Sequence, residues 1–282
     1  MANRISMKLS IPHPAEVDCS IVGVLEQLSE LKPCPGRKIA LVYSVNHSMD
    51  SHKDYLFLKR LAHRLPMDSF RFDFRGNHET PGVWKQGGMD DDLEDIRVVV
   101  DFLKVRYGYV IDLVVGHSRG SIVAFRWICT SEEGASISGF VNASGRYRMK
   151  QWQRSMSAEG HHVWSPIVAR KQVSFKIYPE DITTFANWDT SFVWDSFPAS
   201  PDVLTIHGLS DKAVPSYDAI IYARALNERV PGTHNLHLME DADHNFTGRQ
   251  DEVVDIILEW WDKHAQRTLK TGIWMSGIRG KL

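Results

Sequence analysis

The sequence has few cysteines, no long apolar run and almost no net charge. Its three cysteines, Cys19, Cys34 and Cys129, have no metal-ligand spacing and are too few for a disulfide framework, so we expect reduced thiols. No stretch approaches the roughly eighteen consecutive apolar residues of a membrane-spanning helix, and the first residues lack an apolar signal core. A formal net charge of −2 gives no electrostatic reason to bind nucleic acid or an acidic membrane. These absences favour a cytoplasmic protein with no nucleic-acid partner and no membrane partner.

What is present is an ordinary globular composition, with 43% hydrophobic and 24% charged residues. A chain of 282 residues is long for an average domain, but α/β proteins of this size commonly form one.

The most informative stretch is Gly116–Gly120, with the sequence GHSRG. It follows the apolar run 110–115, which predicts a strand buried on both faces, and it precedes residues 121–128, whose apolar side chains recur at helical spacing. A serine at a sharp strand-to-helix turn needs glycines two positions before and after it, because the neighbouring backbone leaves no room for a Cβ. The pattern therefore indicates Ser118 as a nucleophile. The alternative is a glycine-rich turn without chemistry.

Strand and helix patterns alternate along the rest of the chain, which predicts a mostly parallel sheet flanked by helices. The first two strands, 4–11 and 20–28, are expected to pair as an antiparallel hairpin at a sheet edge. Further strands are predicted at residues 38–45, 70–74, 137–143, 202–206 and 235–239, and helices at residues 55–65, 90–103, 217–227 and 250–263.

The GHSRG segment resembles the nucleophile elbow of the α/β-hydrolase superfamily, and further matches run from about residue 37 to residue 266. Within the superfamily, the chain most resembles small cytoplasmic ester hydrolases of the cinnamoyl/feruloyl-esterase-like and acyl-thioesterase-like kind. The resemblance implies an α/β-hydrolase fold with a small helical cap. Residues 1–146 and 198–282 would form the core, and residues 147–197 the cap insertion.

The resemblance also implies two partners for Ser118. The strand at 202–206 leads into HGLSDKAVP, which is similar to the family segment that carries the triad acid, here Asp211. The last strand leads into residues 240–246, where the family's general base corresponds to His244. The order serine, aspartate, histidine is that of the superfamily, and each residue follows a predicted parallel strand. These three are the candidate catalytic residues.

An oxyanion hole would be formed by the backbone N–H groups of Met49 and Arg119. Residues 47–49 take the place of the family's His-Gly-x segment, with Ser48 instead of glycine, so an ordinary loop is the alternative. His47 is a candidate substrate contact. The Arg119 side chain either attracts a carboxylate-bearing substrate or, as we expect, forms an outward salt bridge.

The insertion holds ten of the 29 aromatic residues, more than its proportional share. Its aromatic side chains either line an apolar acyl or aromatic pocket or pack the cap onto the body. The pocket candidates are Trp152, Trp164, Trp188, Phe192 and Trp194.

The resemblance thus implies a serine hydrolase that cleaves a small-molecule carboxylic ester or thioester through an acyl-enzyme, without a metal or an organic cofactor. Acyl transfer, perhydrolysis and carbon–carbon bond hydrolysis on the same triad remain alternatives, as does a non-catalytic ligand-binding protein. The tail, residues 268–282, is expected either to pack on the body or to contact a second subunit in a homodimer.

Overall fold

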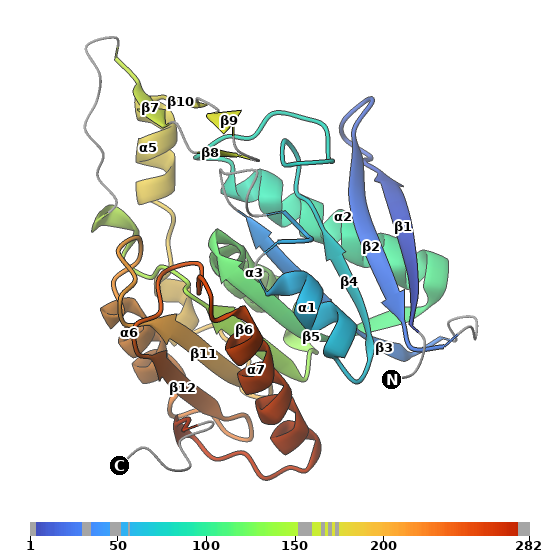
Figure 1. Cartoon of the computed structure of the whole chain (residues 1–282), viewed down its shortest axis with the longest axis vertical. Coiled ribbons are helices and arrows are strands. Elements are labelled where there is room, and N and C mark those ends of the chain that lie inside the picture. Colours follow the sequence, from blue (N-terminus) through green and yellow to red (C-terminus); the bar gives the residue numbers. More distant parts are fainter. Residues whose placement is uncertain are drawn as a thin grey trace.

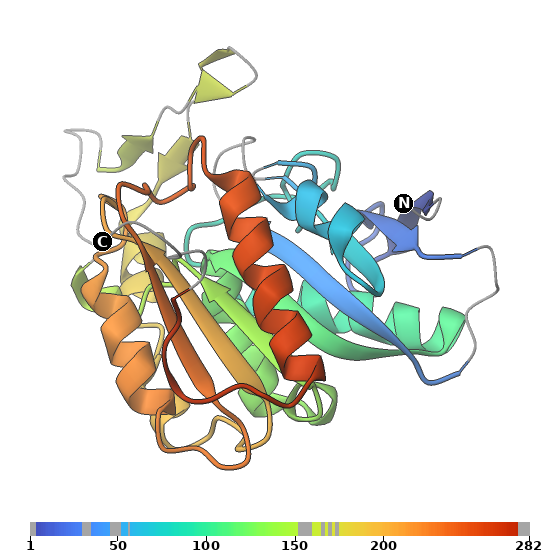
Figure 2. The ribbon, with the colours of Figure 1, turned by 60° about the horizontal axis from the view of Figure 1, so that its bottom comes forward.

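A central sheet of nine strands is covered by helices on both faces (Figures 1 and 2). The structure is a computed structural model of the chain. It describes residues 4–29, 35–45, 52–55, 57–151, 160–164, 167–168, 171–172 and 175–275.

The strand order is β1-β2-β4-β3-β5-β6-β11-β12-β13. The first two strands form the predicted antiparallel hairpin at one edge, and β2 pairs antiparallel with β4. The other pairings within this sheet are parallel. The strands are β1 (Ile5–Pro12), β2 (Ser20–Gln27), β3 (Arg37–Val45), β4 (Asp68–Phe72), β5 (Tyr109–Ser118), β6 (Gly139–Ala143), β11 (Asp202–Gly208), β12 (His234–Met239) and β13 (Gly272–Ile273).

The inner strands of the sheet, from β4 to β12 in this order, are buried on both faces because they carry apolar residues in both directions, whereas the edge strands β1 and β13 are largely exposed. On β3, Leu41 and Tyr43 pack into one core while Ala40 and Val42 pack into the other, as the alternation of a strand requires. One core is completed by helices α2 (Met89–Tyr107), α3 (Arg119–Thr130) and α6 (Tyr217–Leu226), and the other by α1 (Leu58–Arg64) and α7 (Gln250–Ala265).

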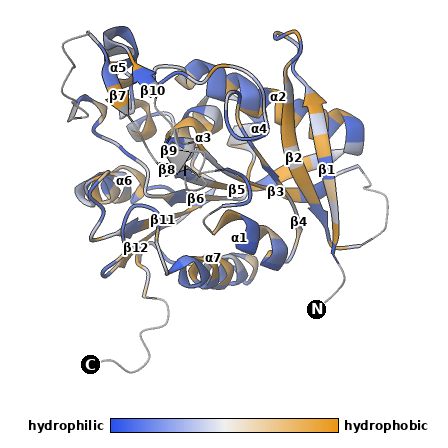
Figure 3. Ribbon diagram, turned by 45° about the horizontal axis from the view of Figure 1, so that its top comes forward, coloured by the Kyte–Doolittle hydropathy of each residue, from blue (hydrophilic) through white to orange (hydrophobic). Residues whose placement is uncertain are grey.

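Helices α1, α2 and α7 each carry both hydrophobic and hydrophilic residues (Figure 3). A short helix, α4 (Glu132–Ala135), follows α3. Among the described helices, none combines the length and the apolarity needed to cross a membrane.

The segment predicted as a helical cap contains strands as well as helix. Its described part has one α-helix, α5 (Pro179–Ala186), and two antiparallel strand pairs, β7 with β10 and β8 with β9. β-branched and aromatic residues are frequent between residues 162 and 177, and these favour extended backbone. The bounds are η1 (Met149–Gln151), β7 (His162–Trp164), β8 (Ile167–Val168), β9 (Lys171–Gln172), β10 (Phe175–Ile177) and η2 (Ser191–Trp194).

The described part of the tail packs on the body, which was one of the two expectations. β13 pairs with β12, and the Trp274 N–H donates to the carbonyl oxygen of Leu236 at 2.8 Å. The side chain of Ile273 is nevertheless 66% exposed.

Two buried histidines, His117 on β5 and His234 on β12, should make the stability of the protein depend on pH. Burial lowers the pKa of each to about 3, from an ordinary value of 6.5. Between these values the unfolded chain binds more protons than the folded one, so the free energy of unfolding should rise as the pH increases from about 3 to about 6.5.

Replacing His234 by glutamine should lower the slope of the free energy of unfolding against pH by at most about 1.4 kcal/mol per pH unit. Urea unfolding at several pH values between about 3 and about 6.5 would measure the change in slope. A slope equal to that of the wild type would show that His234 does not contribute to it.

Candidate active site

Ser118 lies at the turn between β5 and α3, as the sequence predicts. Its φ of 55° and ψ of −123° are strained for a residue with a side chain. A Cβ on Gly116 would lie 2.8 Å from the backbone nitrogen of Ser121, and one on Gly120 would lie 3.2 Å from the ring of Tyr43. The two flanking glycines therefore allow the tight turn that holds Ser118 at the carboxyl end of β5.

The structure brings the side chains of Ser118, Asp211 and His244 together. The His244 Nε2 atom lies 2.8 Å from the Ser118 Oγ atom, and the His244 Nδ1 atom lies 2.7 Å from Asp211 Oδ2. Ser118 ends β5, whereas Asp211 and His244 follow β11 and β12. The carboxyl ends of parallel strands share one edge of the sheet, so residues far apart in sequence meet there.

The Asp211 carboxylate is held by four contacts although its side chain is fully buried. Oδ1 accepts the N–H groups of Ala213 and Val214, each at 2.8 Å, and Oδ2 faces both His244 and His207. Burial raises the pKa of Asp211, but the hydrogen bonds from the two histidines outweigh it and hold the pKa well below its ordinary value. An ionised Asp211 requires a proton on His244 Nδ1, which leaves the Nε2 lone pair facing Ser118.

His207 is a contact that the sequence analysis did not assign. Its Nε2 atom lies 3.3 Å from Asp211 Oδ2 and 3.0 Å from the carbonyl oxygen of Val214. Its place in β11, four residues before Asp211, is the signal that could have pointed to it.

The expectation of an outward salt bridge for Arg119 is wrong. Its side chain is 3% exposed, and its Nε and Nη2 atoms each lie 2.6 Å from Asp92 Oδ2 on the first turn of α2. Its Nη1 atom donates to the carbonyl oxygens of Lys85 and Gln86 at 3.2 and 2.6 Å. Because α2 packs against α3 here, the guanidinium lies inside the body and is not available to a substrate carboxylate.

Removing the partner of this buried guanidinium should strongly destabilise the protein. Burial raises the pKa of Asp92 to about 6, with Arg119 opposing the shift. Asp92→Ala should lower the free energy of unfolding by about 3–5 kcal/mol, because it leaves Arg119 buried without its counter-charge. Urea unfolding should show a change within about 0.5 kcal/mol for the control Asp101→Ala, an exposed acidic residue of the same helix. Equal losses in the two variants would contradict the prediction.

The structure describes only some of the other predicted site residues. Met49, His47 and Trp152 lie outside the described residues, and for Trp164 only the backbone, in β7, is described. The three remaining pocket candidates contact α3 and the start of the insertion, and their role in a substrate pocket stays a prediction. The ring centroids of Trp188 and Phe192 lie 4.9 and 4.0 Å from the Cζ atom of Arg126. The Trp194 Nε1–H donates to the Tyr147 hydroxyl at 2.8 Å.

Within the described part of the chain, one group of side chains has metal-ligand spacing: Asp73, His78 and Glu79. The Lys53 ammonium already contacts two of them, Asp73 Oδ2 at 3.1 Å and Glu79. The cluster is therefore an ion-pair network at the turn after β4.

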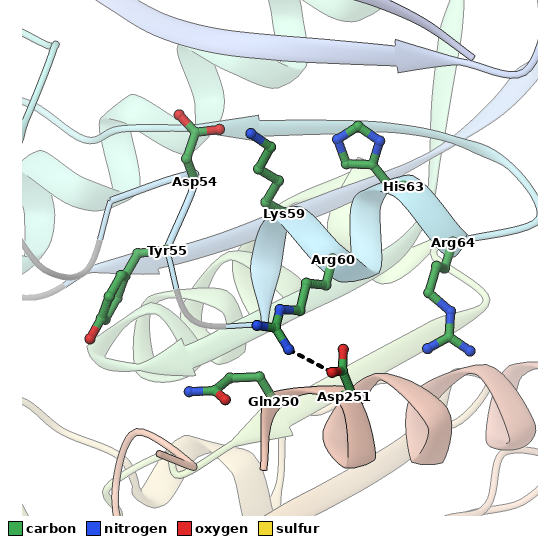
Figure 4. A pocket seen from close by; sticks show the side chains of 8 residues that line it. All are labelled: Asp54, Tyr55, Lys59, Arg60, His63, Arg64, Gln250 and Asp251. Atoms are coloured by element: carbon green, nitrogen blue, oxygen red, sulfur yellow. Dashed lines mark ion pairs between the residues drawn. The ribbon is translucent and has the colours of Figure 1, made fainter. Parts of the chain in front are cut away.

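A surface hollow lies between α1 and α7 (Figure 4). Most of the residues that line it are charged, and Arg60 pairs with Asp251 at 2.7 Å. It includes none of the three candidate catalytic residues. Its lining residues are Asp54, Tyr55, Lys59, Arg60, His63, Arg64, Gln250 and Asp251.

The sequence profile of the alpha/beta hydrolase family matches residues 46–256, about three quarters of the chain. The chain belongs to the alpha/beta hydrolase family. It is 27% identical over 253 residues to the uncharacterized protein YDL057W of Saccharomyces cerevisiae, covering 76% of this chain and 70% of that protein.

Two solved structures are similar in fold. The structure of Est1E from Butyrivibrio proteoclasticus with bound ferulic acid has a TM-score of 0.70 at 14% identity, covering 92% of this chain and 99% of that one. The esterase Pf2001 of Pyrococcus furiosus has a TM-score of 0.64 at 16% identity, covering 92% of each chain.

Proposed function

We propose that this protein is a serine hydrolase that cleaves a small-molecule carboxylic ester or thioester. Ser118 is the nucleophile, His244 the general base and Asp211 the residue that orients His244. The observation that carries the proposal is the continuous pair of contacts Asp211–His244–Ser118, at 2.7 and 2.8 Å. Nucleophile–base and base–acid contacts of this length are what the serine mechanism requires.

In the proposed reaction, His244 Nε2 takes the Ser118 proton as Oγ attacks the acyl carbonyl. The oxyanion accepts the N–H groups of Arg119 and Met49. His244 then protonates the leaving alcohol or thiol, and the acyl group remains on Ser118. A water molecule, deprotonated by His244, attacks this acyl-enzyme and releases the carboxylic acid and free Ser118.

The substrate class is proposed from the fold neighbours and from the insertion. Est1E has been solved with ferulic acid, and Pf2001 is described as an esterase, which supports an ester substrate. The aromatic residues of the insertion suit an apolar acyl or aromatic group.

A fluorophosphonate probe tests this proposal directly. We expect the wild type to be labelled on Ser118, as located by peptide mass spectrometry, and Ser118→Ala to remain unlabelled. A panel of p-nitrophenyl esters and acyl thioesters of graded chain length would then define the substrate. An unlabelled, folded wild type would contradict the proposal and favour a non-catalytic binding protein. Transfer of the acyl group to a competing alcohol in preference to water would assign the protein to acyl transfer.

A further inference from the structure

A second histidine, His117, ties the segment carrying His244 to the elbow. Its side chain is fully buried, and its Nε2 atom lies 2.8 Å from the backbone carbonyl oxygen of His244. Its Nδ1 atom lies 3.1 Å from the hydroxyl of Ser44, near the end of β3. The rings of Phe57 and Phe246 meet the imidazole at steep angles, with centroids 6.1 Å away.

These partners determine the tautomer of His117. A carbonyl oxygen can only accept a hydrogen bond, so Nε2 must carry the proton and donate to His244. Nδ1 then has a free lone pair, which accepts the Ser44 hydroxyl. Burial, together with the neighbouring His244, lowers the pKa of His117 to about 3, in agreement with a neutral ring.

The hydrogen bond joins the two groups whose separation matters for the reaction. His117 directly precedes Ser118, so its backbone moves with the nucleophile. The residue at the other end of the bond, His244, is the proposed general base. Asp211 restrains His244 through the Nδ1 atom of its ring, whereas His117 restrains it through the backbone. Together the two contacts hold the ring and the backbone of His244 in place relative to Ser118.

We propose that His117 is a positioning residue, whose Nε2–H bond to the His244 carbonyl sets the distance between the base and the nucleophile. The inference rests on the proposed function, in which His244 deprotonates Ser118. A misplacement of about 1 Å can cost about 100-fold in rate. Loss of the bond should therefore lower kcat and leave KM almost unchanged, because His117 is buried beneath the turn and has no exposed surface for a substrate to contact.

The test compares three substitutions that differ in the N–H they retain. His117→Gln keeps an N–H near the position of Nε2, His117→Asn is too short to reach the carbonyl, and His117→Leu has no donor. We expect kcat on a p-nitrophenyl acyl ester to fall about 10- to 100-fold in the Asn and Leu variants and less than about 3-fold in the Gln variant. KM should stay within about 2-fold in all three.

The matched control is His234, a buried histidine on β12 with an equally lowered pKa, which contacts Thr205 at 2.9 Å. His234→Asn and His234→Leu should lower the free energy of unfolding, measured with urea, and leave kcat near that of the wild type. Unchanged kcat in folded His117→Asn would overturn the inference. So would a kcat in His117→Gln as low as in His117→Asn at equal stability.

Ser44→Ala gives a second test that leaves the imidazole in place. Without the Ser44 hydroxyl, Nδ1 is left buried without a hydrogen-bond partner and the ring loses one of the two contacts that orient its Nε2–H toward the His244 carbonyl, so we expect kcat to fall several-fold. A wild-type kcat in this variant would overturn the inference even if the His117 variants do not fold. Failure of the proposed function is distinguishable, because the wild type itself would then not react with the fluorophosphonate probe.

Discussion

Replacing Ser118 by alanine should lower kcat for ester hydrolysis by about 10⁶-fold, because no other group can take the place of the attacking oxygen. The variant should retain the fold. Alanine occupies the same strained backbone, with φ of 55° and ψ of −123°, and the Oγ atom contacts only His244 among the hydrogen bonds of the described residues. Steady-state hydrolysis of a p-nitrophenyl acyl ester, with urea unfolding of the same sample, measures both effects.

Ser118→Gly is the control that separates strain from chemistry. Glycine adopts this backbone conformation at little cost, so we expect the variant to be as inactive as Ser118→Ala and more stable by about 1 kcal/mol. A kcat for Ser118→Ala within 100-fold of the wild type would remove Ser118 from the proposed reaction. Equal stability of the two variants would show that the turn stores no strain.

Asp211→Asn should lower kcat by about 10⁴-fold through a change of tautomer in His244. The backbone N–H groups of Ala213 and Val214 both point at Oδ1, so the amide oxygen of an asparagine should occupy that position. Its NH₂ group would then face His244, whose Nδ1 atom would have to accept. The proton would move to Nε2, and the lone pair that receives the Ser118 proton would be lost.

Asp243→Asn provides the matched control for this prediction. Asp243 precedes His244 directly, but its carboxylate accepts the backbone N–H groups of Asn245 and Thr247. We expect its kcat to stay within about 3-fold of the wild type. Comparable losses in Asp211→Asn and Asp243→Asn would indicate a general effect of negative charge near His244 and would contradict the tautomer argument.

Much of the fold follows from local patterns. The continuous apolar run of β5 and the helical spacing of α3 are properties of neighbouring residues, and both elements lie where the sequence predicts them. The edge hairpin of β1 and β2 follows for the same reason. The insertion differs from the helical cap that the resemblance implies, because its β-branched and aromatic residues between residues 162 and 177 favour extended backbone.

The side-chain environment of the site could not be read in this way. Arg119 follows Ser118 in sequence, and the structure alone shows that its guanidinium turns inward to Asp92. The contact of His207 with Asp211 depends on how β11 continues into the next turn. The burial of a side chain and the choice of its partner depend on which helices and loops pack together. The hydrophobic periodicity of neighbouring residues does not encode this packing.

By itself, the sequence determined the strand-turn-helix around Ser118, the alternation of strands and helices, and three candidate residues at strand ends. Only the tertiary structure decided that Ser118, Asp211 and His244 lie within hydrogen-bond distance, and that His117 joins the His244 segment to the elbow. The reason is physical: hydrophobic periodicity acts between neighbours in the chain. A contact between residues 126 positions apart exists only once the parallel strands have assembled and their carboxyl ends meet.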